Sequence, residues 1–348
     1  MKKITILDIA KELGITFSTV ARALNDHPAI SAKTKMAVRE TAERLNYRQN
    51  KIASSLRSGK SNVIGVLVPS LQVTFFSSVV YGIEQVMNAN GYNILLYQSN
   101  EKLEQEKNGI ETFLQSRVDG IIASISTETT HVEHYQEIIT RKTPLLFFDR
   151  IPTQLSVPSV TIDDYKGGFI ATEHLIKQGY KRILHITAEQ DIAIFKERLR
   201  GYIDALLHYN LKIDENLIIK GNFSLAFGKQ VIQEAKINGL NFDAVFALED
   251  FTAMGVMQQL LEYKVNIPKE VGVIGFANES FGSLVTPNLS TIDQQTLTMG
   301  REVAKLFLKQ IKNDTLEDHP EQIVLDPILI VRNSSNKKKP HFKVSKSD

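Results

Sequence analysis

The first 46 residues carry apolar side chains at helical spacing and show no alternating, strand-like pattern. Residues that favour helix N-caps precede three such segments. A glycine after the first segment and a proline after the second favour tight turns between helices. The pattern predicts three short helices: one that follows Thr5 and ends at Gly14, one at 17–24 capped by Thr16, and one from Ser31 to about Leu45.

The segment that follows, residues 48–62, is polar and basic, and Ile52, Ala53 and Leu56 are its only apolar residues. It predicts a linker that could form about two helical turns, too short to be stable alone in water. Leu56 could act as an apolar wedge in a DNA minor groove or could pack on its own protein.

From Val63 onwards, short β-branched apolar runs alternate with amphipathic helical segments. This alternation is typical of βαβ units on parallel sheets. Roughly 270 residues exceed one ordinary open sheet, so two α/β subdomains are predicted. The expected strands are 63–68, 94–97, 120–125, 145–148, 160–162, 183–187, 244–248 and 271–276, and the expected helices are 76–88, 104–116, 134–140, 167–178, 198–208, 228–235, 252–263 and 299–311.

The net charge of +2 is a balance between regions of opposite sign. Residues 1–60 contain 12 Lys and Arg against five Asp and Glu, a net +7. Residues 333–348 carry a net +4 and are predicted to be a disordered tail, either solvated or in non-specific contact with DNA. Residues 61–332 carry −9, and a basic head on an acidic body is typical of a nucleic-acid-binding module joined to another domain.

The composition excludes several classes of site. The chain has no Cys, hence no disulfide framework, thiolate nucleophile or Cys-ligated zinc. Neither a signal-peptide pattern nor an apolar run of membrane-spanning length is found, so we expect a cytoplasmic protein with no membrane partner.

No arrangement of residues indicates an enzyme or a cofactor. Gly59-Lys60-Ser61 resembles the end of a phosphate-binding loop, but it precedes a strand instead of following one. Asp163 and Asp164 are better explained as a strand end and the cap of a helix near Gly167. His131 and His134 have no third metal ligand nearby in the sequence, so neither a metal nor another cofactor is expected.

The second predicted helix has chemistry suited to DNA. Phe17, Ser18, Ala21 and Arg22 share its outward face, opposite Val20. In a major groove, Arg can bind a guanine edge and an apolar group can contact a thymine methyl. The alternative is a small bundle with an incidental arginine, but the turn, the caps and the basic charge together favour DNA binding.

Motifs along residues 1–332 occur in a fixed order: Thr5 to Asn25, Leu45 to Asn50, Ala53 to Asn62, Ile64-Gly65-Val66, Arg117 to Ile122, Phe148-Asp149-Arg150, His174-Leu175-Ile176, Arg198 to Tyr202, Asp250 to Gly255, Val273 to Phe276, and Leu289 to Gln294. This series resembles the lactose-repressor (LacI/GalR) family of bacterial transcription regulators. The resemblance implies a homodimer, or a tetramer, on a pseudo-palindromic double-stranded operator, with a small-molecule effector in the cleft of the body.

The resemblance also implies a domain organisation and a fold class. It combines an all-α helix–turn–helix domain with an α/β body of the periplasmic-binding-protein type I fold, built from two parallel-sheet subdomains. The domains are 1–48 (DNA binding), 49–61 (hinge helix and linker), 62–332 (effector binding and dimerisation) and the tail. The N-subdomain covers about 62–162 and 293–321 and the C-subdomain about 163–292 and 322–332, with crossings near Asp163, Asp293 and Glu321.

Matching positions suggest residues that contact DNA, and Leu56 is then implied to enter the operator centre. Gln49 replaces a proline that is common in the family, and Ala21 replaces a serine that contacts phosphate. The implied DNA-binding residues are Thr5, Thr16, Phe17, Ser18, Arg22, Asn25, Ser31, Asn50, Ala53, Leu56 and Arg57.

Matching positions at strand ends also suggest a ligand site, because ligands bind at the carboxyl ends of parallel strands. Aromatic faces and charged forks suit a sugar or a similar polar ring. Ala277 stands where the family usually has a ligand-binding Asp, which Glu249 could partly replace. The implied ligand-binding residues are Phe75, Phe76, Ser124, Arg150, Arg198, Phe223, Asp250 and Asn278.

Each of these residues also has a structural explanation. The phenylalanines could belong to the core, and Asp149–Arg150 or Arg198–Asp250 could be structural ion pairs. We predict a ligand-responsive transcription regulator, a repressor of sugar-utilisation genes. A solute-binding protein of a transport system and a sugar-processing enzyme are the alternatives, and the sequence leaves open which effector binds and whether it releases or strengthens DNA binding.

Overall fold

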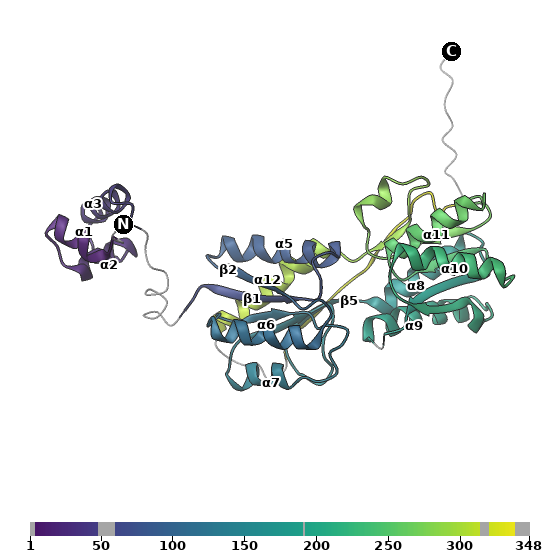
Figure 1. The fold of residues 1–348 in the computed structure, drawn as a ribbon, viewed down its shortest axis with the longest axis horizontal. Coiled ribbons are helices and arrows are strands. Elements are labelled where there is room, and N and C mark those ends of the chain that lie inside the picture. The colour runs from purple at the N-terminus through teal and green to yellow at the C-terminus, as the bar shows by residue number, and fades with distance from the viewer. Residues whose placement is uncertain (1–3, 48–59, 191, 314–319, 338–348) are drawn as a thin grey trace, which may run out of the picture. The chain divides into compact units, whose positions relative to one another are not determined.

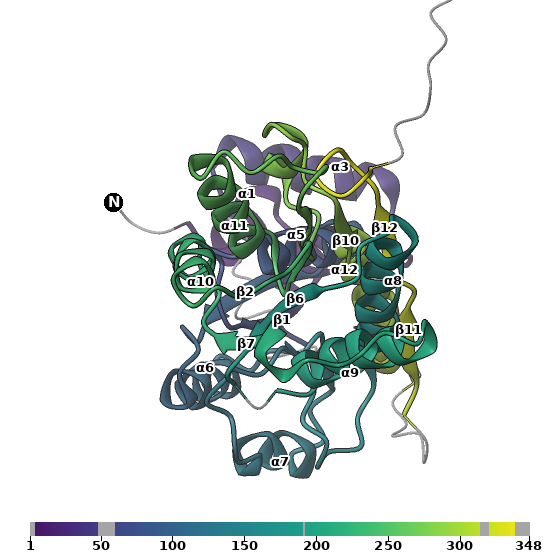
Figure 2. The same ribbon diagram turned by 90° about the vertical axis from the view of Figure 1, so that its right-hand side faces the viewer.

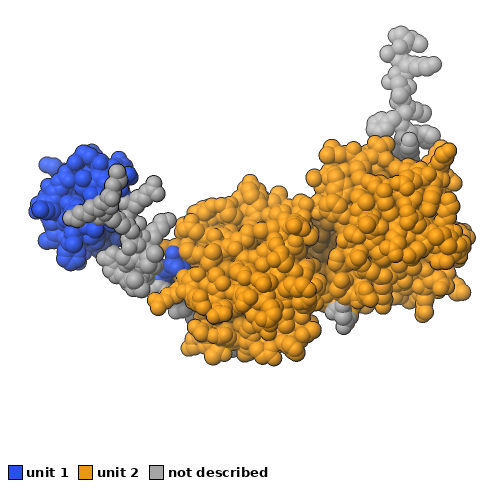
Figure 3. All heavy atoms as spheres, in the orientation of Figure 1, with its two compact units in different colours: residues 1–61 blue, residues 62–348 orange. Residues whose placement is uncertain are grey.

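The computed structural model describes residues 4–47, 60–190, 192–313 and 320–337. The chain divides into two compact units, residues 1–61 and 62–348 (Figure 3). The predicted hinge residues Asn50, Ala53, Leu56 and Arg57 lie outside the described residues.

Within residues 4–47 the first unit has three helices, as predicted (Figure 1). They pack around a small apolar core. The helices are α1 (Ile6–Leu13), α2 (Phe17–Leu24) and α3 (Ala32–Arg44). Each of them contributes to a core that contains Ile9, Ala10, Val20, Ala23, Val38 and Ala42.

Caps fix the boundaries of these helices. Gly14 ends α1 with φ of 61°, a left-handed conformation that glycine adopts without steric cost. The Thr16 hydroxyl accepts a hydrogen bond from the Thr19 N–H at 3.2 Å at the start of α2. The Ser31 hydroxyl accepts one from the Thr34 N–H at 3.1 Å at the start of α3. The predicted caps and turn are therefore confirmed.

The second unit consists of two α/β lobes, each a parallel sheet between two layers of helices (Figure 1 and Figure 2). In the N-lobe, six strands lie in the order β11-β5-β4-β3-β1-β2. Helices α5 and α12 pack on one face of this sheet, and α6 and α7 pack on the other. The bounds are β1 (Val63–Val68), α5 (Thr74–Ala89), β2 (Asn93–Gln98), α6 (Leu103–Gln115), β3 (Ile121–Ala123), α7 (Glu133–Thr140), β4 (Leu145–Phe148), β5 (Ser159–Ile162), α12 (Thr296–Asn313) and β11 (Gln322–Leu325).

The C-lobe has a four-stranded parallel sheet in the order β7-β6-β8-β9. Helices α8 and α9 cover one face, and α10 and α11 cover the other. The bounds are α8 (Asp164–Lys177), β6 (Ile183–Ala188), α9 (Ala193–His208), η1 (Glu215–Leu217), β7 (Ile218–Gly221), α10 (Leu225–Ile237), β8 (Ala244–Ala247), α11 (Asp250–Glu262), β9 (Gly272–Ile274) and η2 (Ser280–Ser283).

Helices α8 and α9 approach closely because glycines lie at their contact. A Cβ atom on Gly168 would lie 2.2 Å from the Arg198 carbonyl oxygen, and one on Gly201 would lie 2.2 Å from the Tyr165 carbonyl oxygen. Real Cβ atoms do not approach so closely, so the two glycines set the separation of the helices. The predicted α8 start near Gly167 is three residues late, because Asp163 caps the helix through the Lys166 N–H at 2.8 Å.

The chain passes between the lobes after β5, after β10 (Thr291–Asp293) and before β12 (Ile328–Ile330). Strands β10 and β12 form an antiparallel pair of their own. The predicted crossing near Glu321 is wrong, because β11 still belongs to the N-lobe sheet, where it pairs in parallel with β5. The third crossing lies at 326–327.

The tail was predicted to begin at residue 333, and this is also wrong. Ser334 and Ser335 are fully buried on the C-lobe. The Ser334 hydroxyl donates to the Val273 carbonyl oxygen at 2.6 Å, and the Ser335 hydroxyl lies 2.7 Å from His174 Nε2. These bonds satisfy the polar side chains of a segment whose composition alone suggested disorder. Residues 338–348 lie outside the described part of the chain.

The described helices are too short or too polar to span a membrane. Across residues 4–47, 60–190, 192–313 and 320–337, none combines the length and apolar character needed to cross a bilayer.

Candidate functional site

The outward face of α2 carries polar and charged side chains and one large aromatic ring. Phe17 is 60% exposed, and Thr16, Ser18 and Arg22 are also exposed. Ala21 is only 6% exposed, so the prediction that it faces outward is wrong. In this small bundle α2 buries a wide face, and the short Ala21 side chain fits against its neighbours. The exposed group matches four of the residues predicted to contact DNA.

Three further predicted DNA residues lie at helix ends. Thr5 precedes α1 and donates its backbone N–H and its hydroxyl to Asp8 Oδ2 at 2.8 and 2.6 Å. Ser31 caps α3, and Asn25 follows α2 and donates its amide to the Ala21 carbonyl oxygen at 2.9 Å. All three are exposed, where helix N-termini and polar side chains can meet phosphate.

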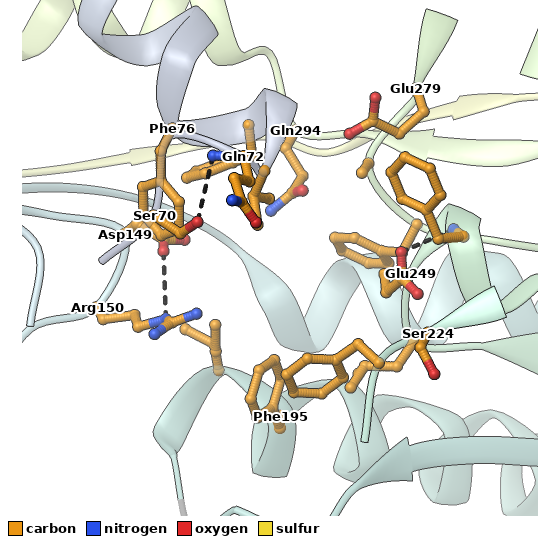
Figure 4. A pocket seen from close by; sticks show the side chains of 18 of the residues that line it. Ser70, Gln72, Phe76, Asp149, Arg150, Phe195, Ser224, Glu249, Glu279 and Gln294 are labelled. Atoms are coloured by element: carbon orange, nitrogen blue, oxygen red, sulfur yellow. Dashed lines mark hydrogen bonds and ion pairs between the residues drawn. The ribbon is translucent and has the colours of Figure 1, made fainter. Parts of the chain in front are cut away.

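A cavity of about 430 Å³ lies in the second unit, where both lobes contribute strand ends and following loops (Figure 3 and Figure 4). Its volume falls in the range of small-molecule sites. The N-lobe provides Ser70, Gln72, Val73, Phe75, Phe76, Glu101, Asp149 and Arg150, the C-lobe provides Ile194, Phe195, Arg198, Phe223, Ser224, Leu225, Leu248, Glu249, Phe251, Phe276, Ala277 and Glu279, and Gln294 follows the second crossing.

Aromatic rings form two walls of the cavity. Phe75 and Phe76 at the start of α5 have ring centroids 5.1 Å apart in an edge-to-face arrangement. Phe195 and Phe223 from the C-lobe have centroids 5.0 Å apart. Such rings give a ligand large apolar faces from both lobes.

Arg150 is held at the N-lobe wall by two acids. Its Nη1 donates to both carboxylate oxygens of Glu101, at 2.9 and 2.8 Å, and its Nε lies 3.8 Å from Asp149 Oδ2. Its guanidinium carbon lies 5.5 Å from the centroid of the Phe76 ring. Burial raises the pKa of Asp149 to about 7, although the adjacent Arg150 charge acts in the opposite direction.

Arg198 is the most constrained charge in the cavity. Its Nε donates to Asp164 Oδ1 at 2.7 Å, its Nη1 donates to the Leu248 carbonyl oxygen at 3.1 Å, and its guanidinium carbon lies 3.7 Å from the centroid of the Phe276 ring. Burial raises the pKa of Asp164, and the Arg198 charge opposes this. The alternative of an Arg198–Asp250 pair is therefore wrong, since the partner of Arg198 is Asp164.

The predicted ligand residues divide into two groups. Phe75, Phe76, Arg150, Arg198 and Phe223 line the cavity. The remaining predicted residues, Ser124, Asp250 and Asn278, are absent from its described lining.

The structure shows what these three residues contact instead. Asp250 is fully buried and accepts hydrogen bonds from the Thr291 hydroxyl and the Glu279 N–H, both at 2.7 Å. The Asn278 amide donates to Asp293 Oδ2 at 3.0 Å. Ser124 is fully buried, and its hydroxyl has no hydrogen-bond partner among the described residues. The structure therefore does not place Ser124, Asp250 and Asn278 in the cavity lining, contrary to the prediction.

Glu279 and Gln294 were not predicted from the sequence as cavity residues. Glu249 was considered only as a partial replacement for the ligand-binding Asp that is absent at Ala277. Glu249 caps α11 and accepts hydrogen bonds from the N–H groups of Phe251 and Thr252 at 2.7 and 2.6 Å. Burial raises the pKa of Glu279, although a hydrogen bond with Thr74 lowers it. The signal that could have found these residues is their position directly after strands or at a crossing.

Within the described ranges, no group of three or more His, Asp or Glu side chains is placed to hold a metal ion. His134 instead contacts the buried Glu106, with Nε2 at 2.8 Å from Oε1.

Comparison with known proteins agrees with both units. Residues 5–50 match the model of bacterial regulatory proteins of the lacI family, and residues 61–333 match the model of periplasmic binding proteins and the sugar binding domain of the LacI family. The chain belongs to the LacI family. It is therefore a DNA-binding transcription regulator.

Two regulators align with this LacI-family chain over nearly the whole length of both proteins. The HTH-type transcriptional regulator RegA of Clostridium saccharobutylicum is 31% identical over 334 residues, covering 95% of this chain and 99% of the relative. Catabolite control protein A of Priestia megaterium is 30% identical over 322 residues, covering 92% and 96%. These relatives are not enzymes, and they support the regulator over the transport alternative.

Solved structures agree with the fold of this LacI-family regulator. The lac repressor dimer bound to operator and an anti-inducer superposes with a TM-score of 0.86 at 23% identity, covering 96% of this chain and 99% of the other. The complex of the transcriptional regulator CelR with cellobiose superposes with a TM-score of 0.71 at 26% identity, covering 95% and 99%.

Proposed function

We propose that this regulator is a cytoplasmic, homodimeric repressor whose affinity for a pseudo-palindromic operator changes when a small carbohydrate occupies the cavity. One observation carries the proposal: the chain that bears the helix–turn–helix unit also contains a cavity of about 430 Å³, lined by aromatic rings and charged forks from two lobes. A DNA-binding unit alone would not need such a site.

Base recognition is proposed for α2. Arg22 and Phe17 are exposed on the same helix, which supports contact of the guanidinium with a guanine edge and of the ring with a thymine methyl. The hydroxyls of Thr16 and Ser18 and the free N–H groups of the first turn suit phosphate contacts. Similar phosphate contacts are proposed for Thr5, Asn25 and Ser31, and the roles of Asn50, Ala53, Leu56 and Arg57 rest on the family resemblance.

The carbohydrate assignment follows from the surfaces of the cavity. Sugar rings present apolar C–H faces and a rim of hydroxyls. Phe76 and Phe195 offer flat apolar surfaces, while Arg150, Glu249 and Gln294 offer donors and acceptors at the same cavity. Two relatives support this class, because the solved structure of CelR contains cellobiose and a LacI-family regulator from Enterococcus faecium was solved with bound ribose.

Effector control is proposed to act through the two lobes. The cavity is lined by both lobes and by Gln294, directly after a crossing strand, so a ligand that contacts all three favours one lobe arrangement over others. Any such preference changes operator affinity by the same factor by which operator DNA changes effector affinity.

Footprinting of the full-length protein on the region upstream of its own gene tests the proposal. We expect one symmetric protected site at physiological salt, whose protection changes when the matching carbohydrate is added. Protection without symmetry, or protection that no cavity ligand alters, would contradict the proposed operator binding or the proposed control, respectively.

A further inference from the structure

The ionisable side chains that line the cavity are predominantly acidic. Four carboxyl groups and two guanidinium groups border it: Glu101, Asp149, Glu249, Glu279, Arg150 and Arg198. Arg150 forms its hydrogen bonds with Glu101, and Arg198 forms an ion pair with Asp164 directly behind the lining. Each arginine charge is therefore already balanced before any ligand enters.

Glu249 and Glu279 remain without a cationic partner among the described residues. Both belong to the C-lobe, and they lie at the same end of the cavity (Figure 4). The Glu249 carboxylate accepts hydrogen bonds from the N–H groups of Phe251 and Thr252 at the start of α11, where the helix dipole favours negative charge. Glu279 is only 6% exposed, so apart from its hydrogen bond with Thr74 its carboxyl group has little polar surrounding to compensate its charge.

A second observation points to a ligand at this place. Gln294 is only 5% exposed, and its amide points into the cavity (Figure 4). Its side chain makes no hydrogen bond with another described residue. Buried amides are normally paired, so this one is placed for a polar group that arrives with the ligand.

We infer that the cavity end formed by Glu249 and Glu279 binds a protonated amine of the effector, which makes the effector an amino sugar. The carbohydrate part of this inference rests on the proposed function, whereas the amine part rests on the two carboxylates. An ammonium group donates strong hydrogen bonds to carboxylates and is attracted to the face of a ring such as Phe251, which lines the cavity and donates its backbone N–H to Glu249.

The same charges select against anionic effectors. A sugar phosphate would bring negative charge next to Glu249 and Glu279, and neither Arg150 nor Arg198 has an unbalanced charge to offset it. Like charges in a partly dry cavity repel strongly, so phosphorylated sugars should bind poorly.

Titration calorimetry on the full chain tests the inference with five probes: D-glucosamine, N-acetyl-D-glucosamine, D-glucose, D-glucose 6-phosphate and 1,4-diaminobutane. At pH 6.5 we expect glucosamine to bind at least about tenfold more tightly than its two neutral analogues and glucose 6-phosphate to bind most weakly. Glu279→Gln and Glu249→Gln should each lower glucosamine affinity about tenfold or more, and should leave glucose affinity nearly unchanged.

The matched control is Glu111→Gln, which removes one negative charge from the exposed surface of α6 and should leave all affinities unchanged. Glutamine can still accept hydrogen bonds at positions 249 and 279, so both variants should fold, and thermal unfolding of each checks this. If one variant unfolds early, the other still tests the charge.

The outcomes separate the amine from the carbohydrate. Equal binding of glucose and glucosamine, tightest binding of the phosphate, or an unchanged preference in a folded cavity variant overturns the amine site and leaves the carbohydrate class intact. Binding of the diamine without any sugar supports the amine site and contradicts the carbohydrate class. Absence of binding by all five probes contradicts both.

Discussion

Replacing Asp164 with asparagine should strongly destabilise the effector-binding unit. Asp164 is buried at the start of α8, and its Oδ1 accepts the Arg198 Nε hydrogen bond at 2.7 Å. Arg198 is equally buried, and among the described residues its ion pair is with Asp164, so its charge would lose its hydrogen-bonded carboxylate after the substitution. The positions of Leu248 and Phe276 around the guanidinium depend on the same pair.

The size of the effect follows from the burial of both partners. Removing one member of a buried ion pair costs about 3–5 kcal/mol, because a charge is left without compensation. Asparagine still offers an oxygen to Arg198, which places the expected loss near the lower end, at about 3 kcal/mol. For a unit of this size, about 2 °C of Tm per kcal/mol gives a fall of about 6 °C.

Scanning calorimetry of the full chain at pH 7.5 measures this fall, with Asp326→Asn as the control. Asp326 pairs with Lys166 at 2.6 Å, but the two side chains are 75% and 47% exposed, so this substitution should leave the Tm nearly unchanged. Adding Arg198→Met to Asp164→Asn should recover part of the stability, because no unpaired charge then remains. A Tm of Asp164→Asn within about 1 °C of the unchanged protein would refute the reasoning.

Three further substitutions test other parts of the account. Arg22→Ala should weaken binding to the operator about 10–100-fold and leave weak, salt-sensitive binding to unrelated DNA, as followed by fluorescence anisotropy; equal loss on both DNAs would exclude base contact. Gly168→Ala should destabilise by about 1–3 kcal/mol in urea, since its Cβ would lie 2.2 Å from the Arg198 carbonyl oxygen, and an unchanged midpoint would argue against the close helix contact. Burial lowers the pKa of His174 to about 4, so its neutral form stabilises the protein above pH 6.5, and about 3 kcal/mol of this is lost as the pH falls to about 4. His174→Gln should unfold with a correspondingly shallower pH dependence, and identical profiles would contradict the assignment.

Local signals in the sequence predicted local structure well. Gly14, Thr16 and Ser31 were predicted as boundaries of the first three helices, and each makes the predicted cap or turn. These features depend on one residue and its near neighbours, and they therefore do not need the tertiary fold. Buried strands such as β1 were equally clear, because they are apolar throughout.

The sequence pattern could not predict which distant segments of the chain pair with one another. Strand β11 pairs with β5 across about 160 residues, and nothing in its own composition assigns it to the N-lobe. Ser334 and Ser335 resemble a solvated tail in sequence, yet their hydroxyls are satisfied by Val273 and His174. Polar residues are buried when distant partners satisfy them, and only the fold shows those partners.

In the candidate site, too, local signals were predicted from the sequence and features that depend on the fold were not. Matching to the positions of the family located five of the residues that line the cavity. Asn278 was misplaced because Ala277 and Asn278 have φ of 134° and 54°, and the Asn278 side chain then bonds Asp293 and Arg332. A positive φ at a residue other than glycine is not evident from the sequence, so the direction of this side chain could not be predicted.

Linkage between the two ligands tests the central claim most directly. Operator affinity of the full-length protein would be measured with and without the sugar that binds the cavity, and sugar affinity with and without operator DNA. The account predicts that both affinities change, by the same factor and in the same direction. An operator affinity that stays constant while the cavity is saturated would contradict it.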